Sequence, residues 1–359
     1  MSMKDEVCRV SYEAALKMTE AIFRACSMTE QDAYMLADSL VRADMRGVKS
    51  HGLVRVPSYV KQLLSGVVSA KSDIEIVHET LFSTVINGHK GFGAVNSYHA
   101  IELTMKKARE HGVAFTAVRN SNHNGAEGLW TYLMSQEKDL IAFCATNSVP
   151  IVAPVNGVGR GVGSNPFSFS IPANRYANLC LDVSCGHMAQ GKIWEYKRLN
   201  KKLPENAWMG PDGEITTDQN KWEVMDYIML PFGGHKGFGI SMIVEALTSA
   251  LADADFQDSW NDVTTVKSTS HCFAAMRIDA FTDAETYRNR IDKYIDYIHA
   301  LPVREGCPAP MFPGEIEASI EAQSWKDGVP VAKQILLDML AAAEELHVDT
   351  SEYQKILAQ

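Results

Sequence analysis

The stretch Val113-Ala-Phe-Thr-Ala-Val118 decides the fold, because strand and helix patterns alternate on both sides of it. Its β-branched and aromatic side chains predict a strand. A strand at Leu81–Ile86 and a long helix over residues 94–111 precede it, and a helix over residues 126–137 and a strand at Leu140–Ala145 follow. This alternation predicts βαβ units around a largely buried sheet.

Helical patterns occupy both ends of the chain. Residues 11–26 and 331–346 carry apolar side chains at helical spacing. Since the middle of the chain is α/β, an economical arrangement packs the two helical ends against each other. We therefore expect residues 1–72 plus 302–359 to form a helical domain, and residues 73–301 to form an α/β domain with a subdomain around residues 187–228.

Composition excludes several classes of protein. The 359 residues are 46% hydrophobic and carry a net charge of −10, which argues against nucleic-acid binding. No apolar run approaches the roughly 20 residues needed to cross a bilayer, and the first residues lack an apolar signal core. The seven cysteines form no Cys-x-x-Cys pair. We therefore expect a cytoplasmic protein with reduced thiols and no metal site.

The polar segment Arg46–Tyr59 holds one candidate site. Ser50, His51 and Arg55 follow one another closely, and a helix starting at His51 would place His51 and Arg55 on one face. Arginine can hold a carboxylate through two parallel hydrogen bonds, and histidine can move a proton. Tyr59 lies four residues further on. The alternative is a polar helix start with a solvated histidine and arginine.

A second candidate lies in the turn Asn120–Gly125, between a predicted strand and a predicted helix. Side chains at the carboxyl end of a strand can line a crevice, so His123 is a second acid/base candidate. The alternative is a simple turn made by Asn, Ser and Gly. Asp182, at the end of another predicted strand, could orient a histidine or cap a helix.

Glycine-rich segments raise the question of a nucleotide. The hexapeptide Gly-His-Lys-Gly-Phe-Gly occurs at Gly88–Gly93 and again at Gly234–Gly239, before an apolar helix each time. Backbone N–H groups at such helix starts can hold an anion. Gly157–Gly163 has glycines at every second position and does not match Gly-x-Gly-x-x-Gly. A dinucleotide would therefore bind without the usual Rossmann turn.

Taken together, six segments appear in the order found in one family. They are Arg46–Tyr59, Asn120–Gly125, Gly163–Pro166, Leu181–Ser184 followed by Gly191-Lys192, Leu230–Gly239 and Phe312–Glu315. Over nearly its whole length the chain resembles the second, non-Rossmann type of malate/L-lactate dehydrogenase. That family also includes ureidoglycolate, sulfolactate and diketogulonate oxidoreductases.

The resemblance implies a mixed-sheet, non-Rossmann NAD(P)-binding domain inserted between the N- and C-terminal helices. It implies interconversion of a 2-hydroxy acid and a 2-oxo acid, most simply malate/oxaloacetate or lactate/pyruvate, by a homodimer that uses NAD or NADP. The implied catalytic residues are His123 and His51 with Ser50. Arg55 matches a carboxylate-binding position, and Tyr59 joins it on the substrate side. The implied cofactor side comprises Ser148, Asn165, Asp182, Ser184, His235, Lys236, Pro313, Gly314 and Glu315.

The chain departs from the family pattern in places. Asn124 stands where an aromatic is common and Lys49 where Asp or His is common, and Leu181–Gly186 is a looser match. Three further readings stay open: a cyclic-imine reductase, a ureidoglycolate or sulfolactate enzyme, and a non-catalytic nucleotide-binding protein. Malate would require a basic group for its second carboxylate, for which Arg46, Lys49 and Arg160 are available.

Overall fold

The computed structural model describes residues 6–188, 192–256 and 269–357; Gly191 of the segment Gly191-Lys192 lies outside these ranges. After a short N-terminal strand come two helices, α1 (Tyr12–Ala25) and α2 (Glu30–Met45). Ser11 and Thr29 cap them, since each hydroxyl accepts a hydrogen bond from the backbone N–H three residues on. The helix α2 ends at Met45 with Arg46 as its C-cap, and Gly47 follows with a positive φ of 80°.

The segment after Gly47 corrects one prediction. The helix expected to start at His51 is wrong, because two 3-10 turns occupy residues 49–51 and 53–55 and the α-helix α3 (Val56–Leu64) begins only after them. The buried Asp44 carboxylate accepts the Leu53 N–H at 2.7 Å, which removes that N–H from helical pairing. His51 and Arg55 therefore share a compact double turn.

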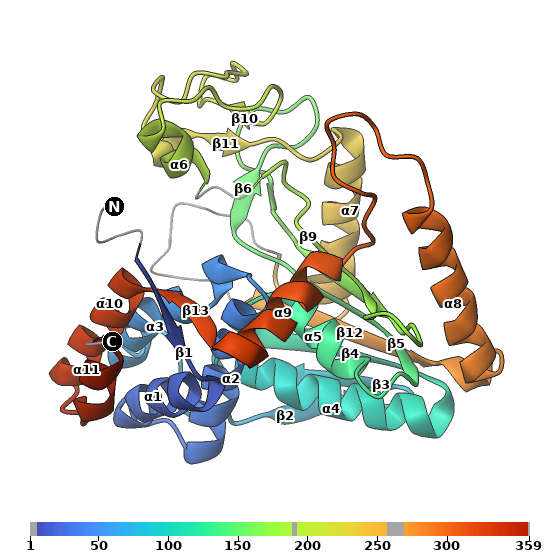
Figure 1. Cartoon of the computed structure of the whole chain (residues 1–359), viewed down its shortest axis with the longest axis horizontal. Helices are drawn as coiled ribbons and strands as arrows, with labels where there is room; N and C mark the ends of the chain where they lie inside the picture. The colour runs from blue at the N-terminus through green and yellow to red at the C-terminus, as the bar shows by residue number, and fades with distance from the viewer. Residues whose placement is uncertain (1–5, 189–191, 257–268, 358–359) are drawn as a thin grey trace.

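The two ends of the chain lie together. Strand β1 (Val7–Val10) pairs antiparallel with β13 (Val329–Ala332), and α10 (Lys333–Glu345) contacts α3. Figure 1 shows the blue N-terminal and red C-terminal elements on the same side of the molecule. The remaining C-terminal helices are α9 (Glu315–Asp327) and α11 (Ser351–Leu357). One buried apolar cluster runs from these helices into the main sheet, so the division into two domains stays a prediction.

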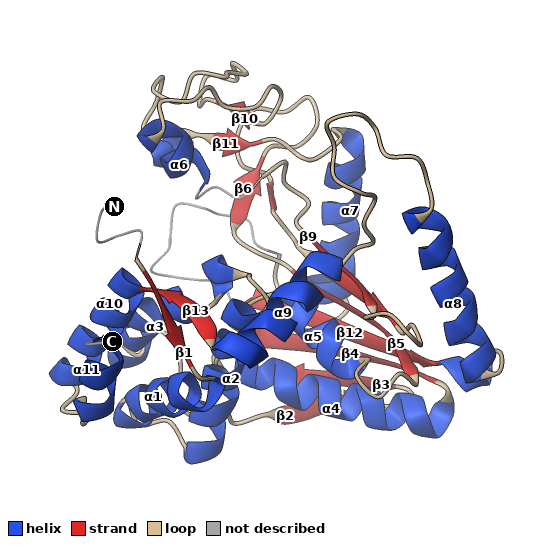
Figure 2. Cartoon of the chain, in the orientation of Figure 1, coloured by secondary structure: helices blue, strands red, loops and turns tan. Residues whose placement is uncertain are grey.

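A mixed seven-stranded sheet forms the centre of the molecule (Figure 2), in the order β2-β3-β4-β12-β5-β8-β9. Its strands are β2 (Glu75–Glu79), β3 (Ser83–Asn87), β4 (Val113–Ser121), β5 (Leu140–Thr146), β8 (Phe167–Ile171), β9 (Leu179–Val183) and β12 (Thr269–Arg277). The unit formed by β3, α4 (Gly93–His111) and β4 is parallel, as the sequence predicted. In contrast, β12 lies between β4 and β5 and runs antiparallel to both.

Helices cover both faces of this sheet. On one face, α4 and α5 (Glu127–Met134) pack against β4, β5, β8 and β12. On the other, α7 (His235–Glu245) continues into a π-helical turn over residues 246–250, which contacts β4, β5 and β12. The helix α8 (Ala284–His299) lies at the far edge of the molecule in Figure 1. The first glycine-rich hexapeptide leads into α4, as predicted, whereas the second is itself helical from His235 onwards and forms the first turns of α7.

A second, smaller sheet stands above the main one (Figure 1) and has the strand order β10-β11-β6-β7. Its strands are β6 (Pro150–Val152), β7 (Val162–Gly163), β10 (Trp208–Met209) and β11 (Ile228–Met229), with the helix α6 (Lys192–Arg198) beside them. Trp208, Tyr227 and Ile193 form its own buried cluster. We call these strands and α6 the small lobe; part of it comes from residues before the expected subdomain around 187–228.

Candidate active site

The structure brings His51 and His123 into contact. The two rings stack with centroids 5.3 Å apart and planes 11° from parallel. His51 comes from the turn after α2, and His123 from the loop between β4 and α5. The helical end of the chain and the main sheet therefore each supply one imidazole to the same place.

Tyr59 of α3 fixes the second ring. Its hydroxyl lies 2.7 Å from Nδ1 of His123, and the backbone N–H of Gly125 points to the same nitrogen at 3.3 Å. Because a backbone N–H can only donate, Nδ1 is the acceptor, and the neutral ring carries its proton on Nε2. Burial raises the pKa of Tyr59 to about 12, so its hydroxyl keeps the proton that it donates to His123.

Ser50 and Arg55 surround the first ring. The Ser50 hydroxyl lies 2.8 Å from Nδ1 of His51, and Nε of Arg55 donates to the Ser50 carbonyl at 2.7 Å. The guanidinium is thus fixed through one nitrogen, while its two terminal nitrogens make no hydrogen bond within the described ranges. A carboxylate could therefore be held by both of them at once.

Both histidines are neutral at neutral pH. Burial, and then the nearby positive charge of Arg55, lower the pKa of His51 to about 4. Burial is also the main reason that the pKa of His123 lies well below its usual value, followed by His51 and Arg55. A neutral imidazole beside a guanidinium is suited to accept a proton from an alcohol whose carboxylate Arg55 holds.

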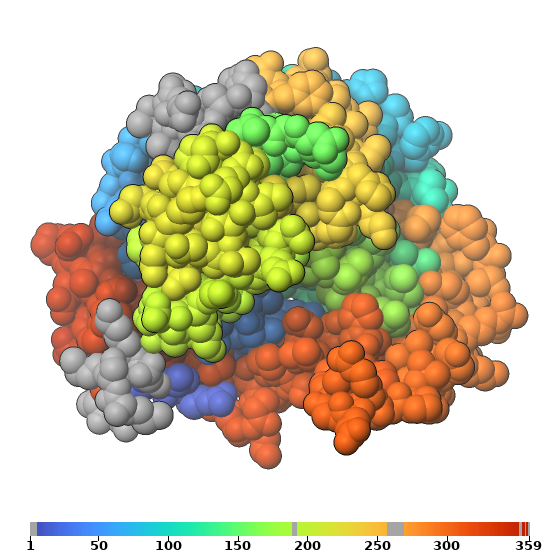
Figure 3. Space-filling view, turned by 90° about the horizontal axis from the view of Figure 1, so that it is seen from above, coloured from blue at the N-terminus to red at the C-terminus, as the bar shows by residue number. Residues whose placement is uncertain are grey.

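A cavity of about 710 Å³ lies next to Ser50, and neither imidazole is part of its lining. Its walls come from the end of α2, the start of α5, β9 and the segment from Phe312 to Glu317. Ser50 belongs to its lining, so the cavity reaches the residue that contacts His51. Figure 3 shows the molecule hollowed between the lime and yellow small lobe and the red C-terminal segment, with blue N-terminal residues at the bottom of the hollow.

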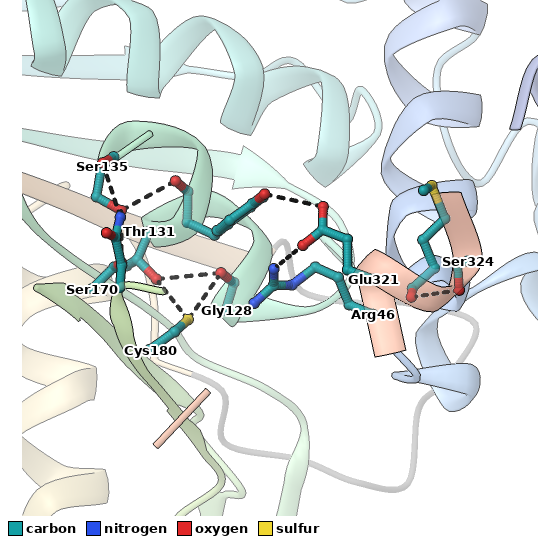
Figure 4. A network of polar contacts seen from close by, with 11 residues as sticks. Arg46, Gly128, Thr131, Ser135, Ser170, Cys180, Glu321 and Ser324 are labelled. Atoms are coloured by element: carbon teal, nitrogen blue, oxygen red, sulfur yellow. Dashed lines mark hydrogen bonds and ion pairs between the residues drawn. The ribbon is translucent and has the colours of Figure 1, made fainter. Parts of the chain in front are cut away.

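The basic side chains around the cavity have different partners. Arg46 is buried and forms a 2.5 Å ion pair with Glu321 of α9 (Figure 4). Its guanidinium also stacks over the Tyr132 ring. Arg160 donates to the Met225 carbonyl within the small lobe. Lys49, by contrast, is exposed and lines the cavity next to Ser50. Of the three basic groups considered for a second carboxylate, Arg46 and Lys49 line this cavity, and Arg46 is already paired with Glu321.

Three residues expected on the cofactor side line the same cavity: Asp182, Pro313 and Gly314. Asp182 contacts no histidine here; its carboxylate accepts the Gly128 N–H at the start of α5, at 2.8 Å. Although Asp182 is accessible through the open cavity, the surrounding protein desolvates its carboxyl and raises the pKa to about 6. A Cβ on Gly314 or Gly128 would come within 3 Å of cavity-wall atoms, which explains glycine at both positions.

Glu315 lies beside the cavity without lining it. Its carboxylate accepts the Phe312 N–H at 3.1 Å and pairs with His299 of α8 at 3.0 Å. In this arrangement Glu315 closes the Phe312–Gly314 turn and ties it to α8.

The other expected cofactor residues gather where β9 ends and α7 begins. The buried Asn165 accepts the Ser148 N–H at 2.9 Å and donates to Glu245 of α7 at 3.1 Å. Ser184 bonds the Ser164 carbonyl, and His235 and Lys236 are exposed at the start of α7. The cofactor-side residues thus form two groups, one at the cavity and one near the start of α7. Residues 182–184, at the end of β9, connect the two groups.

Sequence reasoning missed three buried titratable groups near the histidines. They are Asp44 beneath the double turn, Glu127 three residues after Asn124, and His271 on β12. Glu127 accepts from Asn124 at 2.7 Å and from the Cys144 thiol at 2.8 Å, and burial raises its pKa to about 8. The spacing Asn-x-x-Glu at a helix start was the available signal for Glu127; Asp44 and His271 carry no local motif.

Over residues 6–188, 192–256 and 269–357, no group of three His, Cys, Asp or Glu side chains is placed to hold a metal ion. Within the same ranges, no helix has both the length and the apolar character to cross a membrane.

Known proteins resemble this chain over most of its length. The family model described as malate/L-lactate dehydrogenase matches residues 10–340. An L-sulfolactate dehydrogenase of Methanothermobacter thermautotrophicus is 32% identical over 346 residues, covering 95% of this chain and 98% of that protein. A malate dehydrogenase of Pyrococcus abyssi is 33% identical over 328 residues, covering 89% and 90%.

A solved structure agrees with these relatives. The sulfolactate dehydrogenase of Methanocaldococcus jannaschii superposes with a TM-score of 0.88 at 31% identity, covering 97% of this chain and 99% of that one. The family match, the two relatives and the shared fold agree with the resemblance seen in the sequence. The chain belongs to the malate/L-lactate dehydrogenase family of oxidoreductases.

Proposed function

We propose that this protein interconverts a 2-hydroxy acid and a 2-oxo acid with NAD or NADP, with malate/oxaloacetate or lactate/pyruvate as its substrate pair. One observation carries the proposal: the stacked imidazoles of His51 and His123 lie beside the open end of Arg55. A group that moves a proton and a group that holds a carboxylate are what a 2-hydroxy acid requires.

The residues have distinct roles in this proposal. Arg55 anchors the substrate carboxylate through its terminal nitrogens, with Tyr59 at the same substrate end. His123 is the acid/base: its protonated form gives the Nε2 proton to the substrate oxygen and keeps the Nδ1 proton, which the Tyr59 oxygen then accepts. In the reverse reaction the ring protonated on Nδ1 takes the alcohol proton on Nε2. His51, held by Ser50, orients the substrate or shares the proton.

The residues present fit a nicotinamide cofactor. The cavity next to Ser50 has a volume typical of a ligand site. Its lining combines glycines that allow close backbone approach with two lysines, Lys49 and Lys192, that can face phosphate groups. We place the cofactor side at Asp182, Pro313 and Gly314 in the lining, with Glu315, Ser148, Asn165, Ser184, His235 and Lys236 around it. When bound, the nicotinamide supplies the hydride chemistry.

Lys49 favours a substrate with a second anionic group. It lies next to Ser50 in sequence, lines the cavity and is exposed, whereas Arg46 is engaged by Glu321. A second carboxylate, as in malate, is the simplest group for it to meet. Sulfolactate has a sulfonate where malate has its second carboxylate. Two similar relatives are named as sulfolactate dehydrogenases, so sulfolactate is the second candidate substrate.

Two other readings make different predictions. A reductase of a cyclic imine or a dehydrogenase of ureidoglycolate would use the same fold but would not turn over simple 2-oxo acids. A non-catalytic nucleotide-binding protein would bind the cofactor and turn over none of these compounds; Ser50, His51, Arg55 and His123 all argue against it.

A homodimer is part of the proposal. The outer face of α7 and its π-helical extension is apolar, since Met242, Ile243 and Leu251 are 50%, 60% and 52% exposed. Apolar faces of this kind mark protein contacts. Light scattering should give twice the mass of the 39.6 kDa chain, and Ile243→Glu should shift the protein towards the monomer. A wild-type monomer would exclude the dimer.

One panel of initial rates tests the function. Oxaloacetate, pyruvate, sulfopyruvate, a cyclic imine and ureidoglycolate are each assayed, in the appropriate direction, with the NAD and the NADP form of the cofactor. We expect 2-oxo acid turnover with oxaloacetate preferred, and Lys49→Met should reduce kcat/KM for oxaloacetate more than for pyruvate. Lys61→Met, at an exposed position of α3, is the control. Turnover of imine or ureidoglycolate without 2-oxo acid turnover would exclude the proposal.

A further inference from the structure

His271 lies at the centre of the main sheet and makes no contact with solvent. Its strand β12 runs between β4 and β5, so the side chain can reach the ends of both neighbours. Nε2 lies 2.8 Å from the Ser121 hydroxyl at the end of β4, and Nδ1 lies 2.6 Å from the Thr146 hydroxyl at the end of β5. A single imidazole therefore connects the two strand ends that lead into the site.

The neighbouring donors allow a consistent direction for the hydrogen bonds of His271. Asn96 donates to the Ser121 hydroxyl at 3.0 Å, which leaves the Ser121 hydrogen for Nε2 of His271. Nδ1–H can then donate to Thr146, whose own hydrogen goes to the Ser270 carbonyl at 3.1 Å. Burial lowers the pKa of His271 to about 3, against a smaller opposing effect of a hydrogen bond to the Asn122 backbone, so the ring stays neutral.

The backbone of β4 is irregular at this point. Pairing with β12 jumps from Val118 opposite His271 to Ser121 opposite Thr269, which leaves an extra residue in β4. Asn120 lies within this bulge and has a positive φ of 51°. A bulge redirects the side chains that follow it; here it precedes Ser121 and the turn that carries His123, two residues further on.

We infer that His271 is a positioning residue for His123, acting through Ser121 to hold the end of β4 and the acid/base loop in place. This inference rests on the proposed function for its kinetic test but not for its structural test. It differs from a role in core packing, because packing requires the volume of the ring and positioning requires the Nε2 contact.

Two substitutions separate these roles. In His271→Gln the side-chain amide reaches as far as Nε2 and can keep the bond to Ser121. In His271→Asn it reaches only as far as Nδ1 and keeps Thr146 instead. We expect His271→Gln to retain kcat within about threefold and His271→Asn to lose about tenfold or more, the equivalent of one hydrogen bond, with KM nearly unchanged in both. Ser121→Ala should reproduce the loss.

The matched control is Phe273→Leu, a buried change on the same strand without a polar contact to the loop. It should lower Tm while leaving kcat near the wild-type value. Equal kcat losses for His271→Gln, His271→Asn and Phe273→Leu would overturn the inference in favour of general packing.

A spectroscopic test of the same inference does not require a known substrate. Long-range proton–nitrogen spectra of histidine-labelled protein report the tautomer of each ring. We expect His123 to carry its proton on Nε2 in the wild type and in His271→Gln, and to show mixed tautomers in His271→Asn and Ser121→Ala. An unchanged His123 signal in all variants would overturn the inference, whereas an inactive wild type with the expected spectra would count only against the proposed function.

Discussion

His51 and His123 are 72 positions apart in the chain, yet their rings stack at 5.3 Å and are nearly parallel. Two positive rings at this distance would repel each other, so protonation of one lowers the pKa of the other. A stacked pair can therefore hold one proton more readily than two. This relationship makes the two histidines unequal partners, and their separate surroundings decide which one exchanges the proton.

Substitution of each histidine by asparagine should show that inequality. His123→Asn is expected to lower kcat by about 10²- to 10⁴-fold, the usual contribution of a positioned acid/base. His51→Asn should lower it less, and cofactor Kd should be unchanged in both. Steady-state rates and cofactor fluorescence provide the two measurements. Near-normal kcat in both variants would show that neither histidine is the acid/base.

Tyr59→Phe should weaken the support of His123. The change removes the hydroxyl that lies 2.7 Å from Nδ1, so we expect kcat to fall about tenfold, as for one lost hydrogen bond. Tyr34→Phe, at a tyrosine that is 45% exposed on α2, is the control and should be neutral. A neutral Tyr59→Phe would mean that the Gly125 N–H alone is enough to set the tautomer.

The pH dependence of reduction should follow from the low histidine pKa values. Reduction of a 2-oxo acid requires a protonated acid, and the pKa of His123 lies well below its ordinary value of 6.5. The protonated fraction therefore falls about tenfold for each pH unit across the neutral range, and kcat/KM for reduction should fall with it from pH 6.5 to 8. The reverse reaction should not lose rate over that interval. A plateau in reduction up to pH 8 would contradict the direction of this pKa shift.

Local patterns were enough to predict much of the fold. The predicted strands Val113–Val118 and Leu140–Ala145 lie within β4 and β5 and begin at the same residues, and the helix predicted to end at residue 111 does end at His111. The short pair β1 and β13 was missed, since four residues including Pro330 carry little signal of their own. The order of strands could not be predicted, because the insertion of β12 between β4 and β5 depends on contacts far apart in sequence.

The candidate site, like the fold, could be predicted from local sequence only in part. Ser50, His51 and Arg55 are neighbours in the chain, so their association could be predicted even though the helix proposed for them is wrong. Their meeting with His123 depends on how the helical end packs on the sheet, which only the family resemblance anticipated. Asp44 and His271 were missed, because a single buried polar residue in an apolar pattern does not reveal which loop it supports.

Asp44 gives a prediction about stability and pH. Burial raises its pKa to about 7, against partial compensation by the Leu53 N–H and by Lys49. Because the folded-state pKa lies above the ordinary value of 3.8, the folded protein binds this proton more tightly than the unfolded chain. The contribution to stability is complete below about pH 4 and is lost as the pH rises through 7.

Asp44→Asn removes this titration and keeps an acceptor for Leu53. The free energy of unfolding of the variant, relative to that of wild type, should rise by on the order of 2 kcal/mol between pH 5 and pH 8. This rise should be seen as a difference in Tm that becomes more positive with pH. Asp338→Asn, on the accessible side of α10, should show no such trend. A pH-independent difference for Asp44→Asn would mean that the Asp44 pKa is not raised.

The Arg46–Glu321 pair gives a prediction about how α9 is held. Arg46 and Glu321 are 5% and 8% exposed, and Tyr132 also donates to Glu321 at 3.0 Å. Arg46→Met leaves a buried carboxylate with only that hydroxyl, so we expect a loss of about 3–5 kcal/mol. Urea denaturation measures the loss, with Arg24→Met as the control, since Arg24 forms an exposed pair with Glu20 worth about 0–1 kcal/mol.

The double variant Arg46→Met with Glu321→Leu decides between two explanations of that loss. If the loss comes from an unpaired buried charge, removing the charge as well should restore much of the stability, because an apolar pair of similar volume can replace a buried ion pair. If it comes from the stacking of Arg46 on Tyr132, at 4.0 Å from the ring centre, the double variant should stay as unstable as Arg46→Met. We expect the double variant to regain much of the lost stability. Cofactor binding should be weaker in both variants, because each of them removes the Arg46 side chain from the cavity lining.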